Sequence, residues 1–405
     1  MRDSTRLRVA LFSGNYNYVR DGANQALNRL VGFLGEMGMD VRVYSPTSDT
    51  PAFAPVGTLV PVPSVAIPGR PEYRLALGLA RDARRDLEHF RPDIVHLSAP
   101  DMLGTRAQTW ARRRGIPIVA SLHTRFESYF DYYGLGWARR MVEAHLRRFY
   151  RRSDMVLVPN HALVEEMAGL RGDRGVRLWG RGVDTDLFGP HRRDPAWRRS
   201  LGYGDDEVVI LFFGRLVLEK GVAHFAETIR ALRRQGRRVR PLIVGEGPAR
   251  PVFEALGDVV LTGHLDGPTL GRAIASADIL LTPSTTEAFG NVVLEAMAAG
   301  LAIVSADAPS ARALLTDGVE GLLCSPGRRD AYVEATARLL DSPDARRRLA
   351  AAARWAAGGH DWASTLHTVA DSYEVVRGRP ARTAMPGQPG LPIRPARAPR
   401  RAEIG

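Results

Sequence analysis

The sequence predicts an α/β protein made of two doubly wound domains, each with a parallel sheet. Short, nearly continuous apolar runs alternate with amphipathic segments of helix length through most of the 405 residues. Strands that are apolar on both faces are typical of parallel sheets that helices cover on both sides. This rhythm occurs twice, and a stretch rich in Gly, Pro and polar residues at 181–195 interrupts it. We therefore expect one domain on each side of that stretch.

Five apolar runs in each half are the expected strands. They are 7–13, 41–45, 93–98, 116–123 and 154–159, then 207–213, 240–245, 258–263, 278–284 and 301–306. Helical patterns such as 23–37 and 74–90 lie between them. We place the first domain at 1–182 and the second at 183–360.

The end of the chain has a different composition. Gly358 and Gly359 separate two helical patterns, and the second of them, at 361–380, is the expected closing helix. Pro, Arg, Gly and Ala dominate from there on, with few large apolar residues. Such a composition cannot bury enough surface to fold, so we expect a disordered basic tail at 381–405.

Composition and charge limit the class of protein. Cys324 is the single cysteine, so an internal disulfide is excluded. The first apolar run is too short for a signal peptide, and no run is long enough to span a membrane. We expect a cytoplasmic protein. The net charge of +12 attracts polyanions, but aromatic residues are sparse and nucleic-acid-binding motifs are absent from the sequence. An anionic membrane surface or a phosphorylated substrate accounts for the charge equally well.

The only lysine, Lys220, lies in the octapeptide GRLVLEKG at 214–221; of the 56 Lys and Arg residues the other 55 are arginines. An expected strand precedes the octapeptide, and an expected helix at 222–235 follows it. The start of a helix favours anions, and Arg215 and Lys220 would add two cations. A compact ammonium also suits a crowded phosphate better than a planar guanidinium does. We interpret the octapeptide as a diphosphate site; a basic surface loop is the alternative.

Two glutamates follow the expected strand at 278–284. Glu287 is expected in a loop, and Glu295 is expected inside a helix that begins at about Asn291. In these positions they could hold two parts of one long ligand, with the N–H groups near the helix start as an anion cradle. The alternative is that the glutamates only stabilise the helix and that the apolar residues between them are core.

Two further candidates follow strands of the first half. His123 ends the run at 116–123, where it could hydrogen-bond a substrate hydroxyl or a developing charge. Gly22 opens the first helix and could let the backbone approach a phosphate. An ordinary loop histidine and a simple turn are the alternatives.

The segment 137–154 predicts a helix with apolar and basic faces. Its apolar positions include Trp137, Met141, Leu146 and Phe149, and its basic ones Arg140, Arg147 and Arg151. Such a helix can lie against acidic lipid head groups, or it can pack on the core with a solvated charged face.

Taken together, these motifs resemble the retaining glycosyltransferases of family 4, which have the GT-B fold of two facing Rossmann-like domains. The resemblance runs from the first expected strand to the closing helices. It is most specific in GRLVLEKG, in LWGRGVDTDLF at 178–188 and in the segment with Glu287 and Glu295. The sequence departs from the family where Asp21 and Gly22 replace paired glycines and where Leu218 replaces a frequent proline.

The resemblance implies a role for each candidate residue. The first domain would bind the acceptor, the second would bind the nucleotide sugar, and 181–184 would form the hinge. The implied catalytic residues are His123, beside the reacting carbon, Arg215 and Lys220, on the donor diphosphate, and Glu287, facing the sugar. The implied further donor-binding residues are Gly22, Gly245, Gly263, Phe289, Gly290, Asn291 and Glu295, the last of them on the ribose.

The resemblance also implies the reaction. It is closest to enzymes that pass mannose or a related hexose from a GDP- or UDP-linked donor to a lipid or lipid-linked glycan. We expect a metal-independent, retaining transferase without a cofactor that works at the inner face of the cytoplasmic membrane, with anionic lipid as a possible partner and no nucleic acid. A nucleotide-sugar isomerase of the same fold and a non-catalytic basic adaptor at the membrane are the alternatives.

Overall fold

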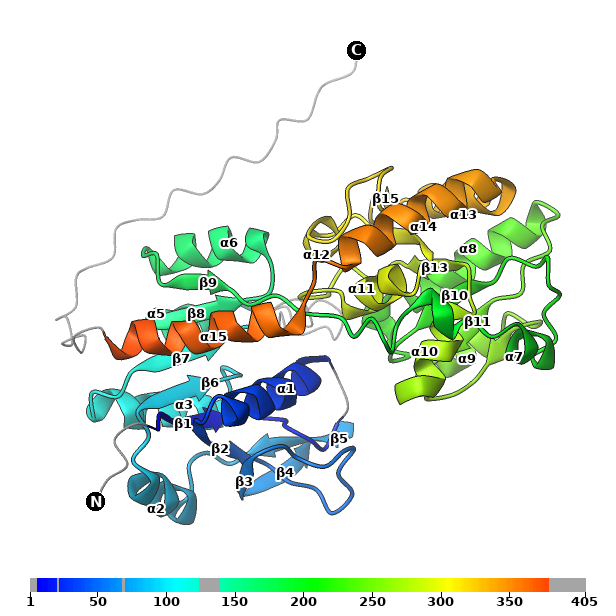
Figure 1. Cartoon of the computed structure of the whole chain (residues 1–405). Helices are drawn as coiled ribbons and strands as arrows, with labels where there is room; N and C mark the ends of the chain where they lie inside the picture. The colour runs from blue at the N-terminus through cyan, green and yellow to red at the C-terminus, as the bar shows by residue number, and fades with distance from the viewer. Residues whose placement is uncertain (1–5, 20–21, 68–69, 124–138, 379–405) are drawn as a thin grey trace.

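The computed structural model describes residues 6–19, 22–67, 70–123 and 139–378 (Figure 1). They form two α/β halves joined side by side, and each half is built around its own parallel sheet. The expected tail at 381–405 lies outside the described residues.

The first half contains a seven-stranded parallel sheet in the order β3-β2-β1-β6-β7-β8-β9. Its strands are β1 (Arg8–Phe12), β2 (Asp40–Ser45), β3 (Thr58–Pro61), β6 (Ile94–Leu97), β7 (Ile118–Ser121), β8 (Met155–Val158) and β9 (Val176–Leu178). Two further strands, β4 (Ser64–Ile67) and β5 (Arg70–Ala76), form a separate antiparallel hairpin.

Helices cover both faces of this sheet. One face packs on α1 (Gly22–Glu36) and on the last helix of the chain, α15 (Trp362–Arg377). The helices of the other face are α2 (Arg81–Phe90), α3 (Met102–Arg113), α5 (Arg139–Arg151) and α6 (His161–Arg171).

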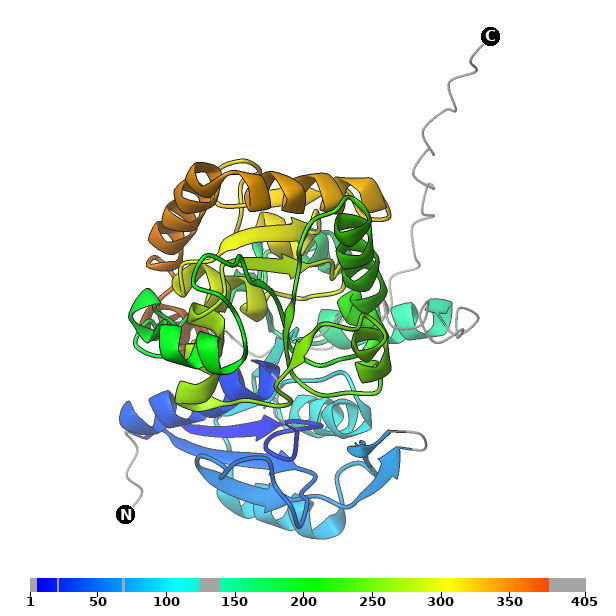
Figure 2. The same ribbon diagram turned by 90° about the vertical axis from the view of Figure 1, so that its right-hand side faces the viewer.

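The second half contains a six-stranded sheet in the order β12-β11-β10-β13-β14-β15, with every pairing parallel. Its strands are β10 (Ile210–Phe213), β11 (Leu242–Val244), β12 (Val260–Leu261), β13 (Ile279–Thr282), β14 (Ala302–Ala306) and β15 (Leu322–Cys324). Figure 2 shows this half in front, with its helices on both faces of the sheet.

The helices of the second half pack on two clusters of buried side chains. One cluster includes residues of α10 (Gly267–Ala275), α11 (Asn291–Ala298) and α14 (Pro343–Ala357). The other includes residues of α8 (Val222–Arg234), α9 (Arg250–Glu254), α13 (Arg329–Asp341) and α14. Within the described residues four short helical segments remain: η2 (Pro190–Arg192), α7 (Pro195–Ser200), η3 (Leu218–Lys220) and α12 (Pro309–Arg312).

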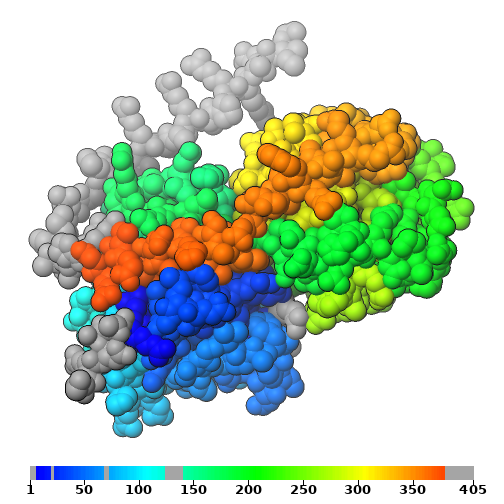
Figure 3. Space-filling view, viewed as in Figure 1, coloured from blue at the N-terminus to red at the C-terminus, as the bar shows by residue number. Residues whose placement is uncertain are grey.

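The chain crosses between the halves twice, and the two crossings lie together. The first follows β9, and the second joins α14 to α15. The backbone N–H of Val183 in the first crossing donates a hydrogen bond of 2.9 Å to the carbonyl of His360 in the second. After the second crossing, α15 lies along α1 on the surface of the first half (Figure 3). The predicted closing helix is therefore present.

All ten expected strands are present, but one helix expectation is partly wrong. The pattern at 74–90 predicted a single helix, whereas its first residues belong to β5 and the helix begins only at Arg81. Pairing of β5 with β4 overrides the local helical pattern there. The basic helix expected over 137–154 is α5, which spans Arg139–Arg151. None of the helices in the described ranges has both the length and the apolar character that a membrane crossing requires.

Packing of α15 generates a prediction about stability. Leu366 is 5% exposed and belongs to the cluster between α15 and the first sheet. Its replacement by Ala leaves a cavity, so Leu366→Ala should lower the free energy of unfolding by about 2–4 kcal/mol, as measured by urea denaturation. Asp371→Ala, on the exposed side of the same helix, is the control and should change it by less than about 0.5 kcal/mol. Equal stability of the two variants would contradict this role of α15.

Candidate functional site

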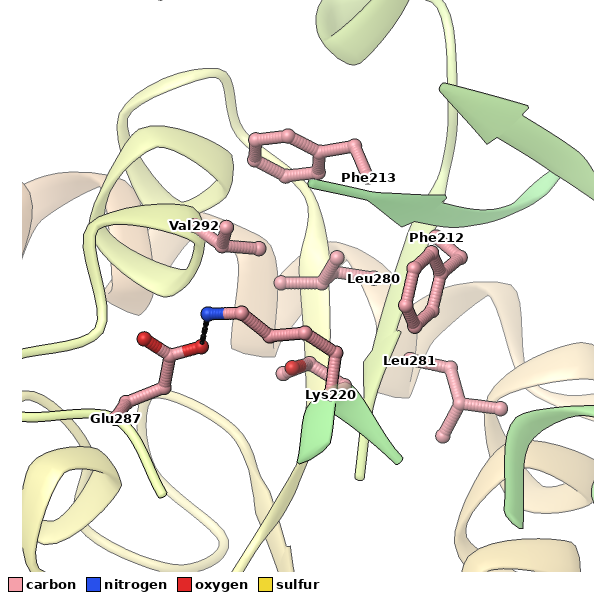
Figure 4. Close-up of a pocket in the computed structure, with 8 residues that line it drawn as sticks. Phe212, Phe213, Lys220, Leu280, Leu281, Glu287 and Val292 are labelled. Carbon is pink, nitrogen blue, oxygen red and sulfur yellow. Dashed lines mark hydrogen bonds and ion pairs between the residues drawn. The ribbon is translucent and has the colours of Figure 1, made fainter. Parts of the chain in front are cut away.

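An ion pair between Lys220 and Glu287 lies at the centre of the candidate site. Lys220 ends the short helical turn η3 (Leu218–Lys220) after β10, and Glu287 lies in the loop between β13 and α11. The ammonium of Lys220 donates to Oε1 of Glu287, and their side chains are 20% and 23% exposed. Figure 4 shows the pair at one side of a pocket whose other lining residues are mostly apolar, among them Phe213 and Val292. The structure thus brings together two of the predicted catalytic residues.

The surroundings keep Glu287 ionised. Burial alone would raise the pKa of its carboxyl, but the charge and hydrogen bond of Lys220 and the charge of Arg215 outweigh burial. The hydroxyl of Ser284, 3.4 Å from Oε1, also favours the carboxylate. The pKa of Glu287 is therefore below its usual value. The site holds one carboxylate between two cations.

Arg215 connects this cluster to the other half of the protein. Its guanidinium donates a hydrogen bond of 2.8 Å to the hydroxyl of Tyr73, which lies in β5. Tyr73 was not predicted as a site residue, because its place beside Arg215 depends on the hairpin that the sequence pattern did not reveal. Tyr73 of the first half thus holds the arginine that was predicted to bind the diphosphate.

The predicted donor loops at Gly245 and Gly263 lie together beside Arg215. The backbone N–H of Gly245 donates to the carbonyl of Gly263 over 2.8 Å. Gly245 has φ 140°, and a Cβ atom there would lie 1.9 Å from the carbonyl oxygen of Gly214. Only glycine permits this approach. The loops that follow β10, β11 and β12 therefore meet at the carboxyl edge of the sheet, the edge where ligands bind in open parallel sheets.

The loop that carries Glu287 lies at the junction of the two halves. A Cβ atom on Gly22, at the start of α1, would lie 1.9 Å from Nδ2 of Asn291. The side chain of Asn160, which caps α6, donates a 2.8 Å hydrogen bond to the carbonyl of Ala288. Predicted site residues from both halves are thus in contact.

The two residues before α11 are also predicted site residues. Phe289 is 7% exposed and meets the ring of His360 edge to face. Gly290 is the residue immediately before α11.

Glu295 lies one turn inside α11, near Arg29 of the first half. Burial raises the pKa of Glu295 to about 8, although the charge of Arg29 lowers it in part. Arg29 also approaches Asp184 of the first crossing at 3.8 Å and lies over the ring of Trp362, 5.1 Å from its centre. The second glutamate is therefore mainly protonated at neutral pH in this structure.

His123 follows β7 and has partners in the first half and in the first crossing. Its Nε2 lies 2.8 Å from Oγ of Ser121, and its Nδ1 lies 2.8 Å from Nη2 of Arg181. Burial, followed by the charges of Arg181 and His96, keeps the pKa of His123 well below its usual value. Among the contacts of the described residues, none joins His123 to the Lys220–Glu287 pair.

In the ranges that the structure covers, no group of three or more His, Cys, Asp or Glu side chains could hold a metal ion.

The sequence matches known families over most of its length. Residues 20–187 match the family described as Glycosyltransferase Family 4, and residues 207–342 match Glycosyl transferases group 1. The GDP-mannose-dependent alpha-mannosyltransferase of Mycolicibacterium smegmatis is 33% identical over 383 residues, which cover 92% of this chain and 98% of that protein. The chain belongs to glycosyltransferase family 4. It is a glycosyltransferase that takes its sugar from a nucleotide sugar.

Other relatives are named for a different transferred group or for a different product. The sulfoquinovosyl transferase SQD2 of Arabidopsis thaliana is 30% identical over 88% of this chain and 71% of its own length. The alpha-monoglucosyldiacylglycerol synthase of Acholeplasma laidlawii is 24% identical over 78% of this chain and 84% of its own. Both are similar to this chain over most of its length.

Solved structures confirm the predicted GT-B fold. Sucrose-phosphate synthase from Thermosynechococcus elongatus aligns with a TM-score of 0.72 at 20% identity, over 92% of this chain and 99% of that one. HepE of Anabaena, solved in complex with UDP and glucose, aligns with a TM-score of 0.70 at 17% identity, over 91% and 100% of the two chains.

The raised pKa of Glu295 generates a prediction about stability and pH. The pKa is about 8 in the folded protein against an ordinary value of 4.5, so the folded protein keeps a proton that the unfolded chain has lost at intermediate pH. The stability linked to this proton is complete below pH 4.5 and is lost as the pH rises through about 8. The melting temperature of the wild type should therefore fall relative to that of Glu295→Gln between about pH 5 and pH 8, and the difference should then level off.

The matched control is Glu165→Gln, on the exposed side of α6. Its melting temperature should follow that of the wild type across the same pH range. A constant difference between the wild type and Glu295→Gln would contradict the raised pKa.

Proposed function

We propose that this glycosyltransferase moves a hexosyl group, most simply mannose, from a GDP- or UDP-linked donor to a lipid or lipid-linked glycan acceptor at the cytoplasmic face of the membrane. The observation that carries the proposal is the cluster of Arg215, Lys220 and Glu287 at the carboxyl edge of the second sheet. Two cations and one carboxylate at this edge suit a ligand that carries both a diphosphate and sugar hydroxyls.

The cluster suggests how the donor binds. Lys220 would exchange the carboxylate of Glu287 for oxygens of the diphosphate, with Arg215 as the second cation. Glu287, released from Lys220, would then accept hydrogen bonds from sugar hydroxyls. As the bond from the sugar to the diphosphate breaks, negative charge grows on the diphosphate, and cations already in place stabilise it.

Names of relatives support the donor and the acceptor. The Mycolicibacterium relative is named for GDP-mannose, and it matches this chain over 98% of its length. The Acholeplasma relative is named for a glucosyldiacylglycerol, a glycolipid. The basic helix α5, on which Arg140, Met141 and Arg147 are exposed, fits an acceptor held in an anionic membrane.

Retention and metal independence are part of the proposal. Arg215 and Lys220 would supply the two positive charges that a divalent cation provides at other diphosphate sites. The acceptor hydroxyl would attack from the face that the diphosphate leaves and would pass its proton to the departing diphosphate, so the anomeric configuration is kept. Transfer should therefore continue in excess EDTA and give an α-linked product from an α-linked donor; loss of activity in EDTA that Mg²⁺ restores would refute metal independence.

Replacement of Lys220 by arginine tests the role of the compact ammonium. The guanidinium keeps the charge but is larger and planar, and the space beside Glu287 is enclosed by Val292 and Leu280. Lys220→Arg should lower kcat at least about tenfold, which corresponds to about 1.4 kcal/mol of transition-state stabilisation. Arg234→Lys, an exposed position in the last turn of α8, is the control and should keep wild-type activity. Equal activity of Lys220→Arg and the wild type would remove Lys220 from the proposed mechanism.

Ligand binding and transfer test the function as a whole. A nucleoside diphosphate that binds only the folded protein raises its melting temperature, so GDP and UDP should be compared with ADP. We expect the largest shift with GDP. Radiolabelled GDP-mannose should then label a lipid extract from membranes in the presence of the enzyme. A shift with none of the three nucleotides, or a changed sugar released without any acceptor, would refute the proposal.

A further inference from the structure

A chain of buried polar side chains runs from α15 to His123. The hydroxyl of Tyr373 lies 2.6 Å from Nδ1 of His96, and Nε2 of His96 lies 2.9 Å from Oγ of Ser121. The same Oγ lies 2.8 Å from Nε2 of His123. Tyr373, His96 and Ser121 are at most 1% exposed. Four side chains, from α15, β6, β7 and the segment after β7, are thus joined by direct contacts.

Burying these polar groups costs free energy, because they lose their hydrogen bonds to water. Apolar side chains in their place would avoid that cost. His96 and Ser121 lie on the face of the first sheet that α1 and α15 cover, where most neighbouring side chains are apolar. Burial lowers the pKa of His96 to about 3, and it raises the pKa of the Tyr373 hydroxyl well above its usual value. Both groups are therefore neutral, and they act only as hydrogen-bond partners.

At the other end of this row of side chains, Arg181 determines which nitrogen of His123 carries the proton. Nδ1 of His123 faces Nη2 of Arg181 at 2.8 Å, and a guanidinium can only donate. Nδ1 must therefore accept, so the single proton of the neutral ring is on Nε2 and points to Ser121. A protonated ring would bring two N–H groups face to face.

Trp179 fixes the orientation of the same ring. It is 1% exposed, and its ring meets those of His96 and His123 edge to face at 5.9 and 5.0 Å. Arg181 lies over the Trp179 ring, 5.1 Å from its centre. The imidazole of His123 is thus held by two hydrogen bonds and one aromatic contact. Since both nitrogens already have partners within the protein, the ring is a fixed dipole rather than a proton acceptor.

We propose that Tyr373, His96 and Ser121 are positioning residues for His123, which hold its ring in one orientation beside the transferred sugar while Arg181 fixes the Nε2–H tautomer. The placement of His123 beside the sugar is what the family resemblance implies, and it rests on the proposed function; its tautomer rests on the contacts above. The helix that closes the fold therefore contributes to the reaction, through a residue that does not touch the substrate.

Beyond Ser121, two proton arrangements satisfy the remaining distances. Ser121 can donate to His96, which then donates to Tyr373, or Tyr373 can donate to His96, which then donates to Ser121. Both arrangements leave His123 as the Nε2–H tautomer. Loss of the Tyr373 hydroxyl removes the outer partner of His96 in either case, so it loosens the support of Ser121 and His123.

Nuclear magnetic resonance of the full-length protein labelled with ¹⁵N-histidine tests the tautomer directly. The chain has ten histidines, and spectra of His123→Gln and His96→Gln identify the two sets of signals. We expect a neutral ring protonated at Nε2 for His123 at pH 7, and a change of its signals in Tyr373→Phe. An Nδ1-protonated or doubly protonated His123 in the wild type would overturn the proposal, whether or not the protein transfers sugar.

Kinetics of Tyr373→Phe test the consequence for the reaction. The variant removes one hydroxyl and keeps the packing of the ring, so kcat should fall about fivefold, as expected for one hydrogen bond, while the donor KM changes less than about twofold. Ser121→Ala removes the direct partner of His123 and should lower kcat further. Tyr44→Phe is the matched control, since Tyr44 is also fully buried in the first half and its hydroxyl donates to Asp86 over 2.8 Å.

A failure of the positioning role and a failure of the proposed function give different results in these experiments. Wild-type kcat in both Tyr373→Phe and Ser121→Ala, in an active enzyme, would overturn the positioning role and leave the proposed function intact. An inactive wild type that binds no nucleotide would refute the proposed function, while the spectra of His123 would still decide its tautomer. An equal loss of kcat in Tyr44→Phe would show that general destabilisation causes the effect, which would also overturn the proposal.

Discussion

The return of the chain to its first half is the constraint on which the rest of the structure depends. After the second sheet is complete, α15 crosses back and covers the same face of the first sheet as α1. The two crossings are hydrogen-bonded between Val183 and His360. The halves are therefore joined by a paired connection. This arrangement sets the loop of Glu287 against Gly22 and Asn160, and it brings Tyr373 to His96.

Strands and motifs could be predicted from the sequence where the signal is local. Most of the ten expected strands are buried and apolar, and the two glutamates lie in the loop and in the helix where the pattern placed them. The hairpin of β4 and β5 was not predicted, because its partly exposed strands lack a continuous apolar run. Tyr73 beside Arg215 was missed for the same reason.

Contacts between distant residues could not be predicted in this way. His96 and Tyr373 are 277 positions apart, and Arg181 and His123 are 58 apart. His123 is a plausible site residue from its place after a strand, but its tautomer depends on partners that only the tertiary structure supplies. The pairing of Lys220 with Glu287, 67 positions apart, likewise gives the two predicted residues a relation that neither motif contains.

Pairing of Lys220 with Glu287 has a consequence for how binding energy is used. The ammonium of Lys220 is paired with the carboxylate of Glu287. On the proposed function, the donor therefore replaces one anion by another, and the net gain on binding the ground state is small. The gain grows as the sugar departs, because the bond that breaks leaves a further negative charge on the diphosphate. An enzyme built in this way reserves its electrostatic stabilisation for the transition state, which raises turnover without binding the donor so tightly that the enzyme is slowed.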